Sequence, residues 1–263
     1  MKKYFLIAAF FLVSLSVLGQ DFDSLISKTA KEQLFNQKNE ILMLLFDGIE
    51  ISNKHKKNEV KWKPNFYESK QFPSSDDGFA YTQLDTVFFY KEYKTKKAVV
   101  IFATYMYEKN GKIDCHSCAP NISIATFEYN EKSKEWKVDT FEKFYGAHGN
   151  WGGIHPMEFK KIGENKYAIL FHSGFTHMGT HDSWTTIYDL YWMKELKTIR
   201  TYHDNSGYYP ESEKEKIVII DTDIEFEKSD KEYYDLIITT KVKNSTSVEI
   251  FEHKNIEGYV LKE

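Results

Sequence analysis

The residues best suited to chemistry in this chain include its two cysteines, which enclose a histidine in the segment Cys115-His116-Ser117-Cys118. A c-type haem site requires a histidine directly after the second cysteine, and Ala119 occupies that position. A thioredoxin-like redox pair would lie at the start of a helix, where the helix lowers the thiol pKa. Pro120 and a β-type run follow here instead. The haem interpretation is therefore excluded and the redox interpretation is disfavoured.

Two interpretations of the cysteine pair remain. A disulfide between Cys115 and Cys118 is expected in an exported protein, and so short a ring stabilises the fold by roughly 2 kcal/mol on a chain-entropy argument. A zinc ion would use both thiolates and two histidines from neighbouring loops, although one cysteine pair supplies only half of a tetrahedral ligand shell. We expect the disulfide.

Histidines form a second group with chemical potential, since imidazole suits metal ligation and proton transfer near neutral pH. Seven of the nine histidines fall in four polar segments, which span residues 113–121, 145–156, 172–184 and 202–210, and the last three of these segments contain glycine. These seven are His116, His148, His155, His172, His177, His181 and His203.

A metal site is one hypothesis for this group. The spacing of the histidines near residue 180 matches neither the two-histidine helix motif of zinc proteases nor a zinc finger. A flexible loop could nevertheless gather them around one zinc ion, with an aspartate as a direct or supporting ligand. The proposed ligands are His116, His172, His177, His181 and Asp182. A serine nucleophile is a further alternative because Ser117, Ser173 and Ser183 lie near histidines, but the chain has no G-x-S-x-G elbow.

Ligand binding is the competing hypothesis, and it centres on the segment from Gly146 to Pro156. Four glycines surround Trp151 there, so the backbone can approach a partner closely while an aromatic plane stacks on a sugar or another flat ligand. The expected ligand-binding residues are Trp151, His148, His155, His177 and His181. The alternative is a tight turn whose tryptophan covers the core.

The elements that position these segments are β-strands. From Leu84 onward, short runs rich in Val, Ile, Phe, Tyr and Thr alternate with charged turns, which indicates successive antiparallel strands. The twelve expected strands lie near 85–91, 97–105, 121–130 and 135–143, near 157–162, 166–173, 183–192 and 196–202, and near 216–226, 232–242, 246–252 and 257–262. We predict an all-β fold of three antiparallel four-strand repeats in a propeller-like arrangement. A two-sheet β-sandwich is the alternative, since closed propellers usually have four or more blades.

The alternating direction of consecutive strands predicts at which end of the sheets the histidine segments lie. If consecutive strands alternate in direction, the loops between second and third strands and between groups lie at one end, and all four histidine segments are loops of this kind. The loops at the other end are compact charged turns. Sites are commonly built on loops held by a rigid scaffold, so we expect the histidine end to be the functional face. The alternative is that these loops never converge.

The region before the strands has two parts. Lys2 and Lys3, an apolar run up to Leu18 and small residues at the −3 and −1 positions for cleavage after Gly19 predict a signal peptide over 1–19. The apolar run is too short to span a membrane. Residues 20–80 are expected to form an N-terminal helix and connector ahead of one β domain over 81–263. Within them we predict a helix over 21–48 with a capping box at Thr29 and Glu32, then a solvated connector over 54–70.

Charge narrows the function. Without Lys2 and Lys3 the chain carries 33 basic and 39 acidic residues, a net charge of −6, which disfavours nucleic acid as a partner. Arg200 is the single arginine, which disfavours phosphoryl chemistry. The leading hypothesis is a secreted or periplasmic binding module for a small molecule, a glycan or an envelope protein, without a cofactor and without a membrane span after signal cleavage. The alternative is a secreted metal-dependent hydrolase with histidine ligands and zinc.

Overall fold

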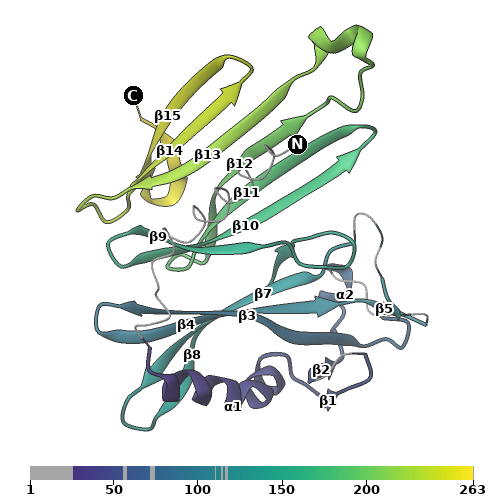
Figure 1. The fold of residues 1–263 in the computed structure, drawn as a ribbon. Helices are drawn as coiled ribbons and strands as arrows, with labels where there is room; N and C mark the ends of the chain where they lie inside the picture. The colour runs from purple at the N-terminus through teal and green to yellow at the C-terminus, as the bar shows by residue number, and fades with distance from the viewer. Residues whose placement is uncertain are drawn as a thin grey trace, which may run out of the picture.

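Antiparallel strands dominate the computed structural model, which describes residues 26–55, 58–71, 75–109, 111–113, 115 and 118–262 (Figure 1). The predicted signal peptide and His116 lie outside these residues. All twelve predicted strands are present, with ends within about five residues of the expected positions. The all-β class is therefore confirmed.

The first sheet has six strands in the order β1-β2-β3-β4-β7-β8. Its strands are β1 (Glu50–Ser52), β2 (Glu59–Trp62), β3 (Ala80–Glu92), β4 (Thr95–Tyr105), β7 (Asn121–Asn130) and β8 (Glu135–Ala147). A separate short hairpin joins β5 (Tyr107–Glu108) to β6 (Gly111–Lys112). The first predicted group of four strands thus forms the larger part of this sheet.

The prediction of a solvated connector over 54–70 was wrong. This stretch contains β2, in which Val60 and Trp62 are buried, and Trp62 Nε1 donates a hydrogen bond to Thr82 Oγ1 at 2.9 Å. Lys61 lies between them on the opposite side of the strand. The lysines therefore obscured the alternation of buried and less buried residues in β2, a strand that extends the sheet.

The second sheet holds the other eight strands in sequence order. They are β9 (Met157–Gly163), β10 (Lys166–His177), β11 (Thr180–Asp189), β12 (Lys194–Asp204), β13 (Ile219–Glu227), β14 (Asp235–Val242), β15 (Ser245–Lys254) and β16 (Gly258–Leu261). Because β12 pairs with β13, the second and third predicted groups are continuous. In the part of the chain that the structure describes, no closed propeller or barrel is formed.

The N-terminal helix α1 (Lys28–Leu45) covers the outer face of the first sheet (Figure 1). It buries Leu34 and Leu42, and its N-cap is Ser27, whose hydroxyl accepts a hydrogen bond from the amide of Ala30. The predicted cap at Thr29 is therefore wrong, since Thr29 lies inside the first turn. Among the described residues, the remaining helical turns are α2 (Glu68–Gln71), η2 (Glu211–Lys216) and η3 (Asn255–Glu257).

Three apolar layers hold these elements together. One lies between α1 and the first sheet, and a second lies between the sheets, where Ile101 and Ile124 meet Ile169 and Phe171. A third fills the inside of the second sheet, which curls so that its two halves face each other. Within the described ranges no helix is long and apolar enough to cross a membrane.

Candidate functional site

The end of strand β10 is where the predicted histidine segments meet. Strand β9 pairs with β10 only as far as Phe171, so the following residues of β10 have no neighbouring strand on that side. The loop between β8 and β9 occupies this position, and its Asn150 side chain donates a hydrogen bond to the Gly174 carbonyl at 3.1 Å. The His172 amide also bonds to Pro156 O at 3.3 Å. The loop therefore lies along the free edge of the strand.

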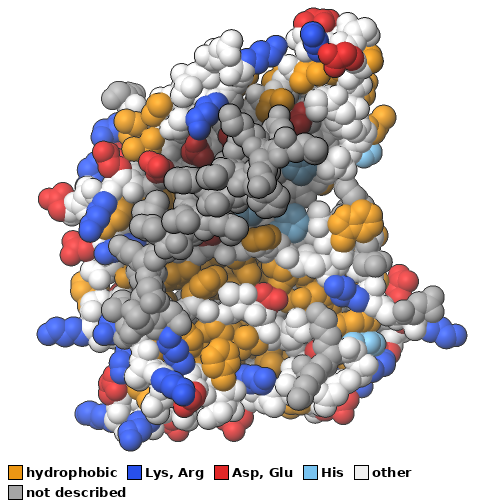
Figure 2. Space-filling model, in the orientation of Figure 1, with side chains coloured by type: hydrophobic (Ala, Val, Ile, Leu, Met, Phe, Trp, Pro, Cys, Tyr) orange, Lys and Arg blue, Asp and Glu red, His pale blue; other side chains and the backbone are white. Residues whose placement is uncertain are grey.

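A cleft of about 640 Å³ opens where the loop meets the hairpin of β10 and β11. Figure 2 shows histidine side chains beside hydrophobic ones near the level at which the two sheets meet. The residues that line the cleft are Asn150, Trp151, His155, His172, Ser173, Gly174, Phe175, Thr176, His181, Ser183, Trp184 and Thr201. Four of the predicted residues, Trp151, His155, His172 and His181, are thus brought together. Trp151 is 58% exposed and does not cover the core.

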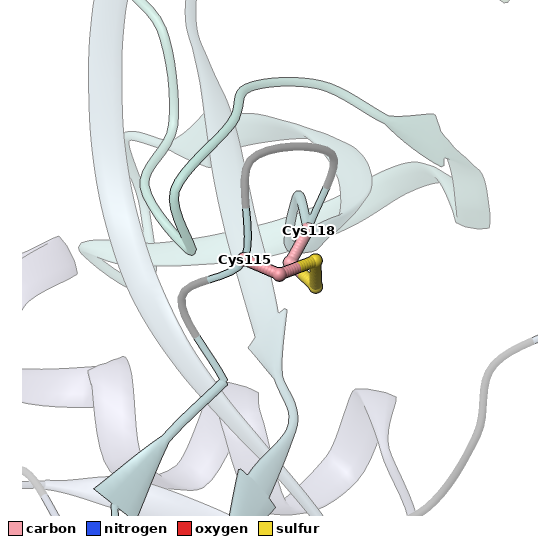
Figure 3. The surroundings of a disulfide bond; sticks show 2 residues. All are labelled: Cys115 and Cys118. Atoms are coloured by element: carbon pink, nitrogen blue, oxygen red, sulfur yellow. A yellow bond between two sulfur atoms is a disulfide. The ribbon is translucent and has the colours of Figure 1, made fainter.

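The disulfide-bonded segment anchors the loop between β8 and β9. Cys115 and Cys118 are bonded, which confirms that prediction and removes both thiolates from metal ligation (Figure 3). The carbonyl of Cys118 accepts a hydrogen bond from the Gly152 amide at 2.7 Å. The residue directly after Trp151 is thereby fixed to the cross-linked segment.

Hydroxyl groups hold the cleft histidines. His181 Nδ1 lies 2.8 Å from Thr176 Oγ1, and its Nε2 lies 3.2 Å from Ser183 Oγ. His172 Nδ1 lies 3.0 Å from Thr185 Oγ1, while its Nε2 lies 3.3 Å from a Glu158 carboxylate oxygen.

His155 differs from these two in its electrostatic setting. Burial lowers the pKa of its imidazole, and the nearby charge of His172 lowers that pKa further. Burial disfavours the protonated form of an imidazole. His155 therefore favours its neutral form at the cleft wall.

A second hollow of about 480 Å³ lies on the other side of β10. It is lined by Gly149, Asn150, Ser173, Gly174, Phe175, His177 and Trp184. The rings of Phe175 and Trp184 stack with centroids 5.5 Å apart. His177 therefore lies near the cleft, but on the opposite side of the strand from His172.

Two further predicted residues are engaged elsewhere. His148 stacks on Tyr145 and Phe171, with centroids at 5.2 and 4.5 Å, and burial lowers its pKa to about 4. Asp182 accepts a hydrogen bond from His203 at 2.8 Å and lies 3.3 Å from Arg200 Nε. Because successive strand residues point to opposite faces, Asp182 faces away from His181.

The expected flexible loop over 172–184 is in fact a regular hairpin. Strand β10 continues to His177 and β11 begins at Thr180, so the register fixes which side chains share a face. Among the described residues, no three His, Cys, Asp or Glu side chains are placed to hold a metal ion. His116, the remaining proposed ligand, lies outside those residues.

Several lining residues were not identified from the sequence. Asn150, Thr176 and Thr201 entered no hypothesis, and Phe175 and Trp184 were not linked to the histidines. The alternation of side chains along the two strands was the signal that could have identified them, since Thr176 and His181 are directly opposed across the hairpin. Extending the two predicted strands toward the glycine at 179 would have placed these two residues on the same face.

Comparison of the chain with protein-family models, with curated proteins and with solved structures found no match. The geometry of the site therefore carries the functional argument.

Proposed function

We propose that this protein is a binding module whose cleft holds a neutral, polyhydroxylated ligand, that is, a glycan. One observation carries the proposal: none of the twelve described residues that line the cleft is Asp, Glu, Lys or Arg. Charged residues make up 28% of the chain, so twelve residues drawn at random would include about three. The cleft is thus depleted of formal charge.

The lining chemistry suits sugar hydroxyls. Ser183, Thr176 and Thr201 both donate and accept hydrogen bonds, and a neutral imidazole donates from one nitrogen and accepts at the other. Asn150 adds an amide. Trp151 supplies a broad apolar plane at the rim, against which the C–H face of a pyranose ring stacks. A ligand pocket combines such an apolar surface with a few convergent polar groups.

Export to the periplasm or the exterior is part of the proposal, because the N-terminal apolar run motivates it and glycans are found there. The proposal also keeps the β domain as three four-strand repeats, two of them merged in one sheet. The metal-dependent hydrolase gains no support from the described residues, which contain no set of three ligand groups.

The test is binding of soluble oligosaccharides, first on a glycan array and then by titration calorimetry. Trp151→Ala is expected to weaken the affinity for the best glycan at least tenfold, because it removes the stacking plane. Trp192→Ala is the matched control, since Trp192 is 52% exposed in the turn between β11 and β12, away from the cleft.

Ionic strength gives an independent readout. Contacts without formal charge are little screened by salt, so the affinity should change less than twofold between 50 and 500 mM NaCl. Binding of only charged ligands with strong salt dependence, or equal losses in the two tryptophan variants, would contradict the proposal.

A further inference from the structure

A chain of three hydrogen-bonding side chains crosses the floor of the cleft: Thr176, His181 and Ser183. We propose that Ser183 is a nucleophile activated by His181, and that the cleft cleaves O-acyl esters. The choice of an esterified sugar as substrate rests on the proposed function, whereas the nucleophile itself does not.

The strand register creates this arrangement. Ser183 and His181 are two residues apart on β11, so their side chains point to the same face. His181 is paired across the hairpin with Thr176. When Nδ1–H donates to Thr176 Oγ1, Nε2 is left unprotonated and accepts the Ser183 hydroxyl proton. This tautomer has the polarity that a general base requires, and the third group orients the imidazole.

Space beside the hydroxyl is provided by Gly174, which is opposite Ser183 in the hairpin. A Cβ atom at position 174 would lie 2.7 Å from Ser183 Oγ and 2.9 Å from the Asp182 carbonyl. Any larger residue would therefore press on the serine. The glycine leaves the hydroxyl open to the cleft.

A neighbouring pair shows what distinguishes Ser183. Thr185 Oγ1 also lies within hydrogen-bond distance of an imidazole, that of His172, and Glu158 lies at the other ring nitrogen. Thr185 is only 1% exposed, so a substrate carbonyl cannot reach it. Ser183 is only partly buried and lines the cleft. Because a substrate in the cleft can reach Ser183 but not Thr185, we assign Ser183 as the nucleophile.

The reaction balances with water as the only co-reactant. Ser183 Oγ attacks the ester carbonyl carbon as His181 Nε2 takes the serine proton. The bond from that carbon to the sugar oxygen breaks, and His181 returns the proton to the departing hydroxyl. Water then attacks the acyl-serine carbonyl carbon and gives a proton to His181. The bond from that carbon to Ser183 Oγ breaks, His181 returns the proton to Oγ, and the carboxylic acid leaves.

The experiment uses two probes that contain no sugar. A fluorophosphonate should label the intact protein at Ser183, as located by peptide mass spectrometry, and p-nitrophenyl acetate should be hydrolysed. Ser183→Ala should abolish labelling and lower hydrolysis at least 100-fold. His181→Gln should slow both at least 100-fold, in line with the usual contribution of a general base. Thr176→Val should slow both about three- to tenfold by releasing the imidazole. Ser247→Ala, at an exposed serine of β15, is the control and should change neither.

Absence of labelling, labelling at another residue, or more than half of the hydrolysis surviving in Ser183→Ala would overturn the proposal. Circular dichroism melting of each variant identifies any that fails to fold, in which case Ser183→Cys, with altered probe selectivity, replaces Ser183→Ala. Glycan affinity is measured separately on the same proteins. If glycans do not bind but Ser183 is labelled, only the binding proposal fails, and the reverse result removes only the nucleophile.

Discussion

The two ends of the packed β-sheets each present an exposed tryptophan, yet the surroundings of these two residues differ. Trp151 lies among hydroxyls, imidazoles and an amide. Trp192 packs edge-on against Tyr191, with ring centroids 5.0 Å apart, and Lys166 Nζ lies 3.1 Å from the centre of the Tyr191 ring. Exposure of an aromatic ring therefore does not by itself define a site. The polar groups around it decide what it can bind.

The polar groups at the far end are already paired. A hollow of about 290 Å³ beside Tyr191 contains Glu92, Lys97 and Asp139. Lys97 Nζ lies 2.7 Å from Glu92 and 3.0 Å from Asp139, so this one lysine pairs with both carboxylates. The cleft end instead offers neutral groups with spare hydrogen-bonding capacity. This difference is why we assign function to only one end.

Glycine substitutions at the two ends should have the largest effects. Gly149 has φ of 131°, and a Cβ there would lie 1.9 Å from the Gly153 carbonyl. At the far end, a Cβ on Gly163 would lie 1.9 Å from the Glu232 carbonyl. Each change to alanine should lower the free energy of unfolding by roughly 2–4 kcal/mol, because backbone must move.

The two glycine variants should nevertheless separate in binding. Gly149→Ala distorts the loop that carries Trp151 and should also weaken glycan affinity, whereas the folded fraction of Gly163→Ala should bind normally. Denaturant unfolding and calorimetry measure the two quantities on the same samples. Equal loss of affinity in both variants would break the distinction between the ends.

The partly buried histidine His148, near the cleft, should make the stability of this end depend on pH. Its pKa of about 4 lies below the ordinary value of 6.5, because burial disfavours the charged form. The neutral histidine thus contributes stability that is complete above pH 6.5 and is lost as pH falls toward 4. One pKa unit corresponds to 1.36 kcal/mol, so this residue alone should remove about 3 kcal/mol between pH 7 and 4. His148→Phe keeps the stacking and should flatten that slope.

Guanidinium unfolding at pH 7.0, 5.5 and 4.5 checks this expectation. His177→Gln is the control, since this exposed side chain loses little solvent on folding, and it should keep the wild-type slope. If His148→Phe loses stability with acid as steeply as the wild type does, the burial of His148 is not the cause.

The strands could be predicted because alternation and charged turns are local signals. The division of these strands between two sheets could not be predicted, since it depends on whether β9 forms hydrogen bonds with β8 or lies in a separate sheet. Strands β1 and β2 were missed because runs of only three or four residues, each with charged side chains, give little pattern. The cap at Ser27 was missed because Thr29 and Glu32 imitate a capping box.

For the site, strand parity predicted that histidines gather at one end, but not which ones share a face. The sequence pattern ended one strand at 173 and began the next at 183, which left the hairpin tip as a loop. Once β10 and β11 continue to His177 and Thr180, Asp182 turns away from His181. His148 was assigned to the ligand because its burial against Phe171, which lies on a different strand, is not a local property of the sequence.

The smallest expected effect concerns the cross-link, which only the cleft end possesses because the chain has two cysteines. The double variant Cys115→Ser/Cys118→Ser should lose about 2 kcal/mol of stability, the chain-entropy value for so short a ring. It should also weaken glycan affinity by less than threefold, since Gly152 keeps its bond to the backbone of residue 118. A reductant should lower the melting temperature of the wild type but not of the double variant. If the reductant shifts both equally, the disulfide does not stabilise this end, and the loop carrying Trp151 is held by its backbone hydrogen bonds alone.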